Sequence, residues 1–448
     1  MFSLDFQNFV KEHAQADVLK LALQAHLYPK IAIKLAIQQI QGRQKAKTKL
    51  PFLYACDNIV YPIPLSVEQC SSEMAANFKA NLLKKLLQLD TKREENITNN
   101  TTISNTNRTT LIDLTGGFGI DSYFFSKVFE KVIHIEQQQE LSEIAAHNFR
   151  ALQATNISCY CENGLEFLQT YSESITCLYI DPARRDKNSQ KVVSLEDCEP
   201  NLVEILPFLW QKTTAILLKT SPMLDLKKAI LQLTTLQPNC VRDVVIVAVE
   251  NECKEVLYYL TNPSISNQNI ANQNITEINK QINFHTFNLH TNKAHQEFSF
   301  SETDEQNVTI SYQKPLQYLY EPNAAVLKSG AFKTVAHHFG LYKLHSNTHL
   351  YTSDNLVSDF VGRTFAILQV CKFDKKEILQ HLANLQTNQK LNQQNSHLQA
   401  NISVRNFPLS VEEFRKKTGI KDGGEIYIFA ATDMANHKIV IISKAIKP

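Results

Sequence analysis

The spacing of apolar residues divides the chain into a part with helical periodicity and a part with strand periodicity. Within residues 1–90 apolar positions recur every three or four residues, as in VLKLALQAHL and IAIKLAIQQI, and this spacing predicts amphipathic helices. From residue 111 short apolar runs alternate with amphipathic segments, which predicts a parallel sheet covered by helices on both faces. Strands are expected at LIDLT, KVIHIE, ISCYC, TCLYID, TAILLKTS, VRDVVIVAVE and INFHTFNLH, and helices at QQELSEIAAHNFRAL, GLEFLQ, LEDCEPNLVEILPFL and MLDLKKAILQL.

The same pattern sets the expected limits of the domains. We expect a mainly helical domain at residues 1–92, an α/β domain with a Rossmann-like sheet at residues 109–292, and an α+β domain at residues 293–448, where strands and short helices mix. Three polar, Asn-rich tracts of low complexity are expected to form surface loops. They cover residues 95–108, 261–281 and 385–401.

Composition narrows the class of protein. The chain has 448 residues and a formal net charge of +2, so a polyanionic partner would be held by a local basic patch and not by a global field. No apolar run is long enough to span a bilayer, and the first residues lack the pattern of a signal peptide. The nine cysteines are scattered without a C-x-x-C pair, which excludes a zinc ribbon and a disulfide scaffold. We therefore expect a cytoplasmic protein.

The stretch LIDLTGGFGID places a glycine turn directly after a predicted buried strand. In an open α/β sheet, ligands bind beyond the carboxyl ends of the strands, and glycine lets the backbone approach them closely. A phosphate-binding loop would need a Lys followed by Ser or Thr, and a dinucleotide-binding turn would need the third glycine of G-x-G-x-x-G. Here Gly117-Phe118-Gly119 is followed by Ile-Asp-Ser, so neither pattern is complete.

S-adenosylmethionine belongs to a third class of ligand that such turns hold. It carries an ammonium, a carboxylate and a ribose diol but no pyrophosphate, so the helix after the turn need not come as close. Asp113 ends the first strand, and Glu136 ends the second, where its carboxylate can accept hydrogen bonds from ribose hydroxyls. Asn163 follows the third strand, where a polar side chain can meet the adenine edge. The interval from the turn to Glu136 is the one that a βαβ unit predicts.

With these motifs in register, the chain resembles the class I (Rossmann-like) S-adenosylmethionine-dependent methyltransferases. The resemblance is carried by LIDLTGGFGID, VIHIE, ENG and YIDPARR, each at the end of a successive predicted strand. The stretches QGRQKAKTKLP, SVEQCSSEMAANFKA, YLYEPNAAVLKSG and RNFPLSVEEFRKKTGIKDGGEIYIFA resemble the bacterial group whose C-terminal part is called a THUMP-like domain. The resemblance implies S-adenosylmethionine as cofactor, although the family more often has Asp in place of Asn163. The implied cofactor-binding residues are Asp113, Thr115, Gly116, Gly117, Gly119, Asp121, Glu136, Asn163 and Gly164.

The fourth predicted strand ends in Asp181-Pro182-Ala183-Arg184, which we assign to the reacting end of the site. Methyl transfer from a sulfonium is a direct displacement, so the enzyme mainly aligns the acceptor and excludes water. Asp181 can accept a hydrogen bond from a target amino group or take its proton, and Pro182 fixes the backbone that follows. In amino-methylating relatives the motif reads Asp/Asn-Pro-Pro-aromatic. Ala183 and Arg184 replace the second proline and the ring, so the motif does not by itself point to an exocyclic amine of adenine or guanine.

Two further candidates at the reacting end each have two interpretations. Arg184 and Arg185 either grip phosphates or stack on a base, or Arg184 pairs with a local acid and holds the loop. Lys219, at the end of the next strand, either lines the substrate side together with Ser221 or only extends its ammonium to water. TSPMLD contains no Cys, and Cys198 falls in a predicted helix, so we set aside the cysteine mechanism of C5 pyrimidine methylation.

Basic residues on both sides of the predicted core bear on the substrate. GRQKAKTKLP precedes the core, and Lys and Arg interspersed with Phe and Tyr follow it within residues 328–343 and 405–421. This composition suits RNA, although a solvated basic face has the same pattern. The histidines of VAHHFGLYKLHSNTHL lack a converging ligand pattern, so no metal is expected.

We therefore predict a methyltransferase that acts on a base in tRNA or rRNA. One alternative is a methyltransferase that acts on a protein or a small molecule. The other is a non-catalytic RNA-binding protein with a vestigial cofactor fold. The intact glycine turn, Glu136 and Asp181-Pro182 argue against the non-catalytic protein.

Overall fold

The structure is a computed structural model that describes residues 2–89, 109–184, 194–263, 281–387 and 398–446. Most of the three tracts predicted to be loops lies outside these residues. The chain separates into two compact units: unit 1 is Met1–Arg242 with Leu257–Thr276, and unit 2 is Asp243–Val256 with Glu277–Pro448. Among the described residues, no helix is both long enough and apolar enough to cross a membrane.

The N-terminal part of unit 1 is helical, as predicted. Side-chain oxygens of Ser3, Asp17 and Ser72 accept hydrogen bonds from backbone N–H groups in the first turns of α1, α2 and α6, so these helices begin where the sequence provides a cap. The helices are α1 Leu4–Glu12, α2 Val18–Leu23, α3 Ile33–Lys49, α4 Pro51–Tyr54, α5 Pro64–Gln69 and α6 Glu73–Leu86.

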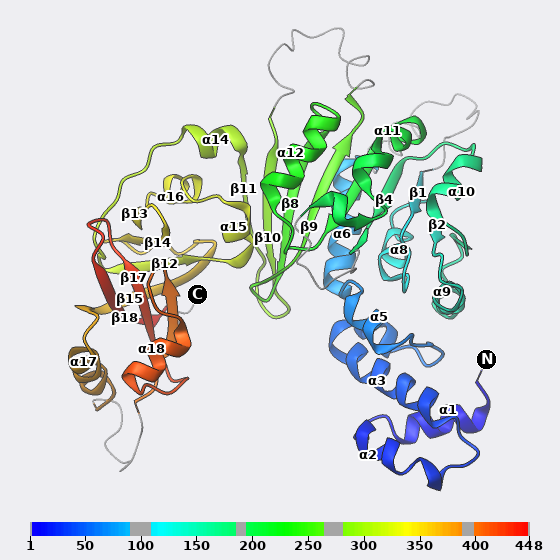
Figure 1. Cartoon of the computed structure of the whole chain (residues 1–448), viewed down its shortest axis with the longest axis horizontal. Helices are drawn as coiled ribbons and strands as arrows, with labels where there is room; N and C mark the ends of the chain where they lie inside the picture. Colours follow the sequence, from blue (N-terminus) through cyan, green and yellow to red (C-terminus); the bar gives the residue numbers. More distant parts are fainter. Residues whose placement is uncertain (1, 90–108, 185–193, 264–280, 388–397, 447–448) are drawn as a thin grey trace, which may run out of the picture. The chain divides into compact units, whose positions relative to one another are not determined.

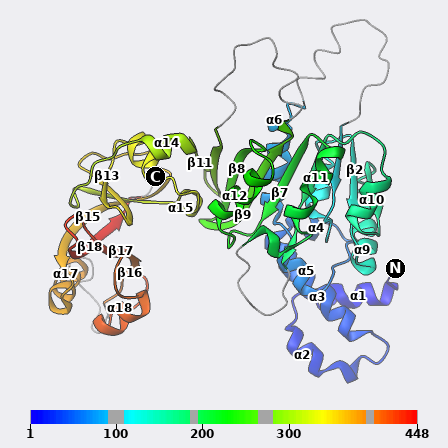
Figure 2. The same ribbon diagram turned by 45° about the horizontal axis from the view of Figure 1, so that its top comes forward.

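The rest of unit 1 is built on a parallel sheet with the strand order β7-β4-β1-β2-β3, which confirms the predicted Rossmann-like fold (Figures 1 and 2). The chain runs from β1 outward to β2 and β3 and then returns to β4 on the other side of β1. A ligand crevice is therefore expected at the carboxyl ends of β1 and β4, where the order reverses. The strands are β1 Thr110–Asp113, β2 Lys131–Ile135, β3 Ile157–Tyr160, β4 Cys177–Ile180 and β7 Ala215–Thr220.

Amphipathic helices cover this sheet. In both ribbon views α12 lies in front of the strands and α6, from the N-terminal region, lies behind them (Figures 1 and 2). The helices that connect the strands are α8 Ile120–Phe125, α9 Gln139–Ala151, α10 Gly164–Thr170, α11 Leu202–Lys212 and α12 Leu226–Leu236.

The segment before α11 differs from the prediction of one helix over LEDCEPNLVEILPFL. The helix begins only at Leu202, because Asn201 caps it by accepting a hydrogen bond from the backbone N–H of Val203. The preceding residues form a 3₁₀ turn and the two-residue strand β6 Cys198–Glu199, which pairs with β5 Ala183–Arg184. Cys198 therefore lies in a short strand and not in a helix.

Unit 2 begins with a small set of strands. β8 Val241–Val249 and β10 Asn283–Leu289 are parallel, and β10 pairs with β11 Gln296–Ser301 in the antiparallel sense. The sequence pattern did not predict β11 or the long strand β9 Glu252–Thr261, whose second half from Leu257 belongs to unit 1.

Residues 318–445 form a seven-stranded sheet with the order β13-β14-β12-β15-β18-β17-β16, which confirms the predicted α+β character. Its neighbouring strands pair in the antiparallel sense except for β16 with β17, which are parallel. The strands are β12 Tyr318–Pro322, β13 Tyr342–His345, β14 Thr348–Ser353, β15 Gly362–Lys372, β16 Asn401–Arg405, β17 Ile426–Thr432 and β18 Lys438–Ala445. The helices of this unit are α14 Glu302–Asn307, α15 Ala324–Ser329, α16 Thr334–His338, α17 Lys375–Thr387 and α18 Val411–Thr418.

Candidate functional site

The glycine turn connects the end of β1 to the start of α8. Gly117 and Gly119 have φ angles of +55° and +85°, in the left-handed region that favours glycine. A Cβ at Gly116 would lie 2.2 Å from the ring of His134, and one at Gly119 would lie 2.5 Å from the ring of Phe149. A Cβ at Gly117 would meet nothing closer than a backbone oxygen at 3.8 Å. Gly116 and Gly119 are thus needed for packing, whereas Gly117 borders open space that a ligand can fill.

Glu136 follows β2 and holds this turn. Its side chain is largely buried, and its Oε2 accepts a hydrogen bond of 2.9 Å from the backbone N–H of Gly117. Its Oε1 accepts a bond of 2.7 Å from the backbone N–H of Gln138. Each carboxylate oxygen has a second lone pair, so Glu136 can hold the turn and still accept a hydrogen bond from a ligand hydroxyl.

Asp113 lies at the end of β1 within a buried chain of polar side chains that the sequence analysis missed. Ser122 Oγ donates to Asp113 Oδ2 at 2.6 Å and lies 3.0 Å from Nδ1 of His134. Burial raises the pKa of Asp113 to about 7, although the bond from Ser122 opposes this shift. Burial also lowers the pKa of His134 to about 4, so its ring is neutral at pH 7. His134 belongs to the same VIHIE motif as Glu136, two residues earlier on the same face of β2.

Asn163 and Gly164 lie at the start of α10, after β3. Asn163 caps this helix, because its Oδ1 accepts from the backbone N–H groups of Leu165 and Glu166 at 2.9 and 3.4 Å. Its side chain is exposed. A Cβ at Gly164 would lie 2.8 Å from the backbone oxygen of Leu114, so Gly164 allows the end of β3 to approach the glycine turn.

The reacting end predicted at Asp181 meets the glycine turn directly. The backbone N–H of Asp181 donates to Thr115 Oγ1 at 2.7 Å, and Asp181 Oδ2 lies 2.5 Å from Nζ of Lys219 at the end of β7. The Lys219 side chain is 11% exposed and that of Asp181 is 35% exposed, so the carboxylate faces outward and the lysine stands behind it. Pro182 is buried. Lys219 thus pairs with a carboxylate and does not simply extend its ammonium to water, while its place on the substrate side stays a prediction.

Arg184 and Arg185 remain undecided between their two interpretations. The backbone of Arg184 pairs with Cys198, while its side chain and all of Arg185 fall outside the part of the chain that the structure describes.

Asp121 in the first turn of α8 joins a second polar cluster that sequence reasoning missed. Its Oδ2 accepts from Tyr179 Oη at 2.7 Å and from Ser71 Oγ at 2.9 Å, and its Oδ1 lies 3.2 Å from Nζ of Lys79. Burial alone would raise the pKa of Asp121, but Lys79, Lys219 and the two hydroxyl donors lower it below its ordinary value. The sequence held one signal for this cluster, because Lys79 falls among the apolar residues on the buried face of α6.

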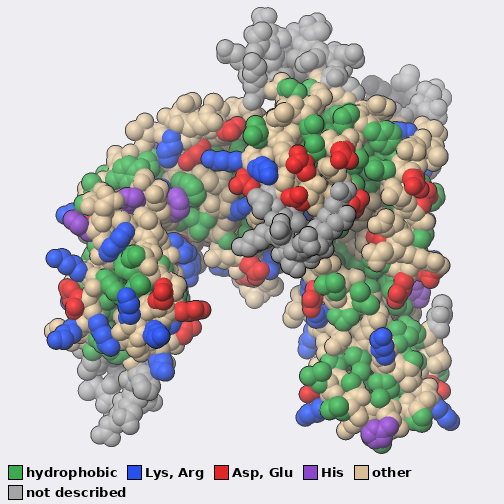
Figure 3. Space-filling view, viewed as in Figure 1, with side chains coloured by type: hydrophobic (Ala, Val, Ile, Leu, Met, Phe, Trp, Pro, Cys, Tyr) green, Lys and Arg blue, Asp and Glu red, His purple; other side chains and the backbone are tan. Residues whose placement is uncertain are grey.

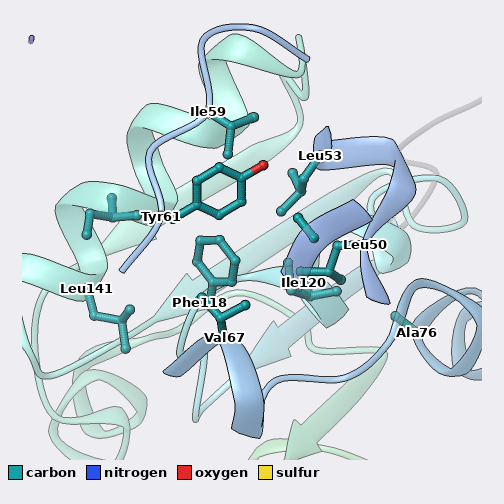
Figure 4. Packing of buried hydrophobic residues seen from close by; sticks show 11 residues of the cluster. Leu50, Leu53, Ile59, Tyr61, Val67, Ala76, Phe118, Ile120 and Leu141 are labelled. Carbon is teal, nitrogen blue, oxygen red and sulfur yellow. The ribbon is translucent and has the colours of Figure 1, made fainter. Parts of the chain in front are cut away.

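Apolar residues of the N-terminal helices enclose the other side of the glycine turn (Figure 4). Phe118, between the two left-handed glycines, and Ile120 pack in one buried cluster with Leu50, Leu53 and Tyr61. The N-terminal region therefore packs against the turn that is predicted to bind the cofactor.

A separate pocket of about 700 Å³ lies between α1, α3, residues 57–61 and the face of α9 that carries Glu140 and His147. None of the predicted site residues lines it.

The histidines of residues 335–350 do not converge. His338 packs edge-on against Phe298, His349 stacks on Phe332, and His345 Nε2 lies 3.1 Å from Asn436. Within the described ranges there is no group of three or more His, Cys, Asp or Glu side chains that could hold a metal ion.

Comparisons with known proteins support the fold of both parts. A ferredoxin-like domain family matches residues 318–360, and a THUMP domain-like family matches residues 362–445. The crystal structure of a candidate methyltransferase from Porphyromonas gingivalis W83 superposes with a TM-score of 0.76 at 28% identity, over 99% of this chain and 98% of that one. No protein with a curated description matches the chain.

Shorter methyltransferase structures match part of the chain. An rRNA methylase from Streptococcus thermophilus covers 35% of this chain and 87% of its own, with 14% identity and a TM-score of 0.27. A candidate RNA methyltransferase from Pyrococcus horikoshii covers 48% of this chain and 98% of its own, with 11% identity and a TM-score of 0.30. At these scores the likeness establishes no shared substrate.

Proposed function

We propose that this chain is a Rossmann-like methyltransferase with a C-terminal THUMP-like domain, and that it uses S-adenosylmethionine to methylate a base in RNA. The observation that carries the proposal is the hydrogen bond of 2.7 Å from Asp181 to Thr115, which joins the glycine turn to an outward-facing carboxylate at the switch point of the sheet.

The residues around the glycine turn fit S-adenosylmethionine. The open space beside Gly117 admits a ligand close to the backbone, and the second lone pairs of the Glu136 carboxylate suit the two ribose hydroxyls. The amide nitrogen of Asn163, whose oxygen is used by the helix cap, can donate to an adenine nitrogen. When bound, the cofactor supplies an electrophilic methyl group. We propose that Asp113 and Asp121 support the cofactor site without contacting the cofactor. Their carboxylates already accept hydrogen bonds from the hydroxyls of Ser122 and Ser71.

Asp181 is proposed to orient the acceptor. Lys219 binds Oδ2, which leaves Oδ1 to accept a hydrogen bond from the N–H of a target base. The free oxygen of the carboxylate can also take the proton that the acceptor loses. A nucleophile fixed in line with the methyl group gains rate mainly from positioning.

RNA is favoured over a protein or a small molecule by basic residues near this site. GRQKAKTKLP covers the end of α3 and the first residue of α4. Lys45 is paired with Glu68, and Nζ of Lys49 donates to the backbone oxygen of Glu68 at 2.5 Å. The ammonium of Lys49 acts electrostatically on Cys70, next to Ser71 at the site. In Figure 3 the Lys and Arg side chains of residues 318–445 are mixed with acidic ones, so RNA would contact single basic side chains there and not a continuous basic surface.

The test is transfer of labelled methyl groups from S-adenosylmethionine to undermodified total RNA, with protein and small-metabolite fractions in parallel. Asp181→Asn removes the charge without changing the shape of the side chain, and we expect a rate loss of about 100-fold or more, the range for a general base. Glu173→Gln, in the exposed pair with Lys131, is the matched control and should keep full activity. Label that appears only in protein or metabolites would transfer the proposal to those acceptors. Cofactor binding without label in any fraction would contradict catalysis.

A further inference from the structure

We infer that the N-terminal helical region supplies two positioning residues to the methyl-transfer site, Ser71 and Lys79, which fix Lys219 against Asp181. The inference rests on the proposed function, because it takes Asp181 as the residue that orients the acceptor. It makes the helices before residue 90 part of the site and not a separate module.

The hydroxyl of Ser71 is the centre of this arrangement. It donates to Asp121 Oδ2 at 2.9 Å and accepts from Nζ of Lys79 at 3.0 Å and from Nζ of Lys219 at 3.3 Å. A serine hydroxyl has one donor and two acceptor lone pairs, so these three contacts use its full capacity. Ser71 thus has one orientation that satisfies every partner, and the position of Lys219 depends on it.

Charge balance explains why Lys79 is buried. Its side chain has no exposed surface, and a buried ammonium is tolerated only when a carboxylate and further acceptors surround it. Lys79 and Lys219 bring two positive charges to Asp121 and Asp181, so the quartet of these four residues is neutral. Loss of one member would leave a charge uncompensated in a buried place.

The quartet connects the proposed cofactor site with the proposed acceptor site. Asp121 stands in the first turn of α8, directly after the glycine turn, while Asp181 follows β4 and faces outward. Ser71 lies between α5 and α6 and bridges the two through Lys79 and Lys219. The contacts of Ser71 thus connect the first turn of α8 to the contact between Lys219 and Asp181.

The neighbouring serine provides a control for this inference. Ser72 caps α6, because its hydroxyl accepts a hydrogen bond from the backbone N–H of Ala75. Ser71→Ala and Ser72→Ala each remove one hydroxyl from the same segment, and loss of the cap costs about 1 kcal/mol of stability. A role limited to stability would show in both variants.

The first experiment measures methyl transfer to total RNA and cofactor affinity in the full chain. We expect Ser71→Ala to lower kcat about tenfold or more, the scale of a hydrogen bond to a charged group, with the KM for RNA and the Kd for S-adenosylmethionine within about twofold. Ser71→Thr, which keeps the hydroxyl, should recover most of the rate. Equal rates for Ser71→Ala and Ser72→Ala would overturn the inference. A wild-type chain without activity on RNA would instead contradict the proposed function.

A second experiment needs no acceptor and therefore tests the inference even if RNA is not the substrate. Lys79→Met leaves the charge of Asp121 uncompensated next to the glycine turn, so we expect the Kd for S-adenosylmethionine to rise about tenfold or more. Adding Asp121→Asn removes both charges together and should recover most of the affinity. If the double variant binds as weakly as Lys79→Met, or if Lys79→Met binds normally, the charge-balanced quartet does not position the site.

Discussion

Asp113 is the residue whose environment departs most clearly from what its position in the sequence suggests. It ends β1 as predicted, but it is buried, and its carboxyl bonds to the hydroxyl of Ser122 and to the backbone N–H of Thr115. The raised pKa of about 7 means that the folded state keeps a proton which the unfolded chain releases near pH 4. This contribution to stability is present below pH 4 and is lost as the pH rises through 7.

Replacing Asp113 by Asn should remove this dependence. Asn keeps the shape and an acceptor for Thr115, so stability should fall less between pH 5 and 8 in the variant than in the wild type. The difference should be at most about 3 kcal/mol, since roughly two of the three units of the pKa shift fall in this pH range. Urea unfolding followed by the fluorescence of Trp210, the chain's single Trp and part of unit 1, measures the change. Asp354→Asn, at an exposed position, is the control. Parallel pH curves for wild type and Asp113→Asn would show that the buried carboxyl is ionised throughout.

At the scale of elements, apolar runs predicted β1, β2, β4 and β7 because these strands are buried on both faces. β3 was predicted as well, although it is only half-buried. β9 was missed because the turn before it, Glu250-Asn251, has φ angles of +49° and +65° without a glycine to signal a hairpin. β11 was missed because Ser and Glu interrupt its apolar positions. The sequence pattern placed four predicted site residues at or next to the ends of strands: Asp113, Glu136, Asp181 and Lys219. Ser71 and Lys79 depend on how α6 packs, which no local pattern specifies.

The glycine turn allows a prediction that separates packing from ligand contact. Gly119→Ala places a methyl group against Phe149 at a left-handed φ, so it should destabilise unit 1 by about 2 kcal/mol or more. Gly117→Ala meets no side chain and should cost only about 1 kcal/mol of strain while it fills the space beside the backbone. We therefore expect Gly117→Ala to weaken S-adenosylmethionine binding about tenfold or more, as measured by calorimetry. Unchanged affinity in Gly117→Ala would place the cofactor elsewhere.

At the scale of the whole molecule, the structure changes the role that the sequence suggested for the N-terminal region. Sequence patterns predicted a mainly helical domain at residues 1–92, and these helices fall in one compact unit with the parallel sheet. Two independent sets of contacts join them: the apolar cluster around Phe118 and the polar contacts of Ser71 and Lys79. Both sets reach the glycine turn or the helix that follows it, so changes far from the site within unit 1 should alter cofactor binding.

Gly42 in α3 tests this coupling, because two effects of opposite sign compete there. Glycine within a helix is about 1 kcal/mol less favourable than alanine, so propensity alone predicts that Gly42→Ala stabilises the chain. The added Cβ would lie 2.3 Å from Cβ of Tyr61, whose ring packs in the cluster with Phe118 (Figure 4), and overpacking of a core costs about 1–3 kcal/mol. Crowding should win, since backbone-anchored atoms at that distance must move apart.

We therefore expect Gly42→Ala to lower the free energy of unfolding of unit 1 and to weaken S-adenosylmethionine binding, although α3 carries no residue assigned to the cofactor. Trp210 fluorescence in urea and calorimetry measure the two effects, and Gln41→Ala on the same helix is the control that should change neither by much. A stabilised variant with normal affinity would mean that helix propensity outweighs the contact with Tyr61. In that case α3 would be only an attachment to the fold, and the glycine turn would keep its shape without support from the N-terminal region.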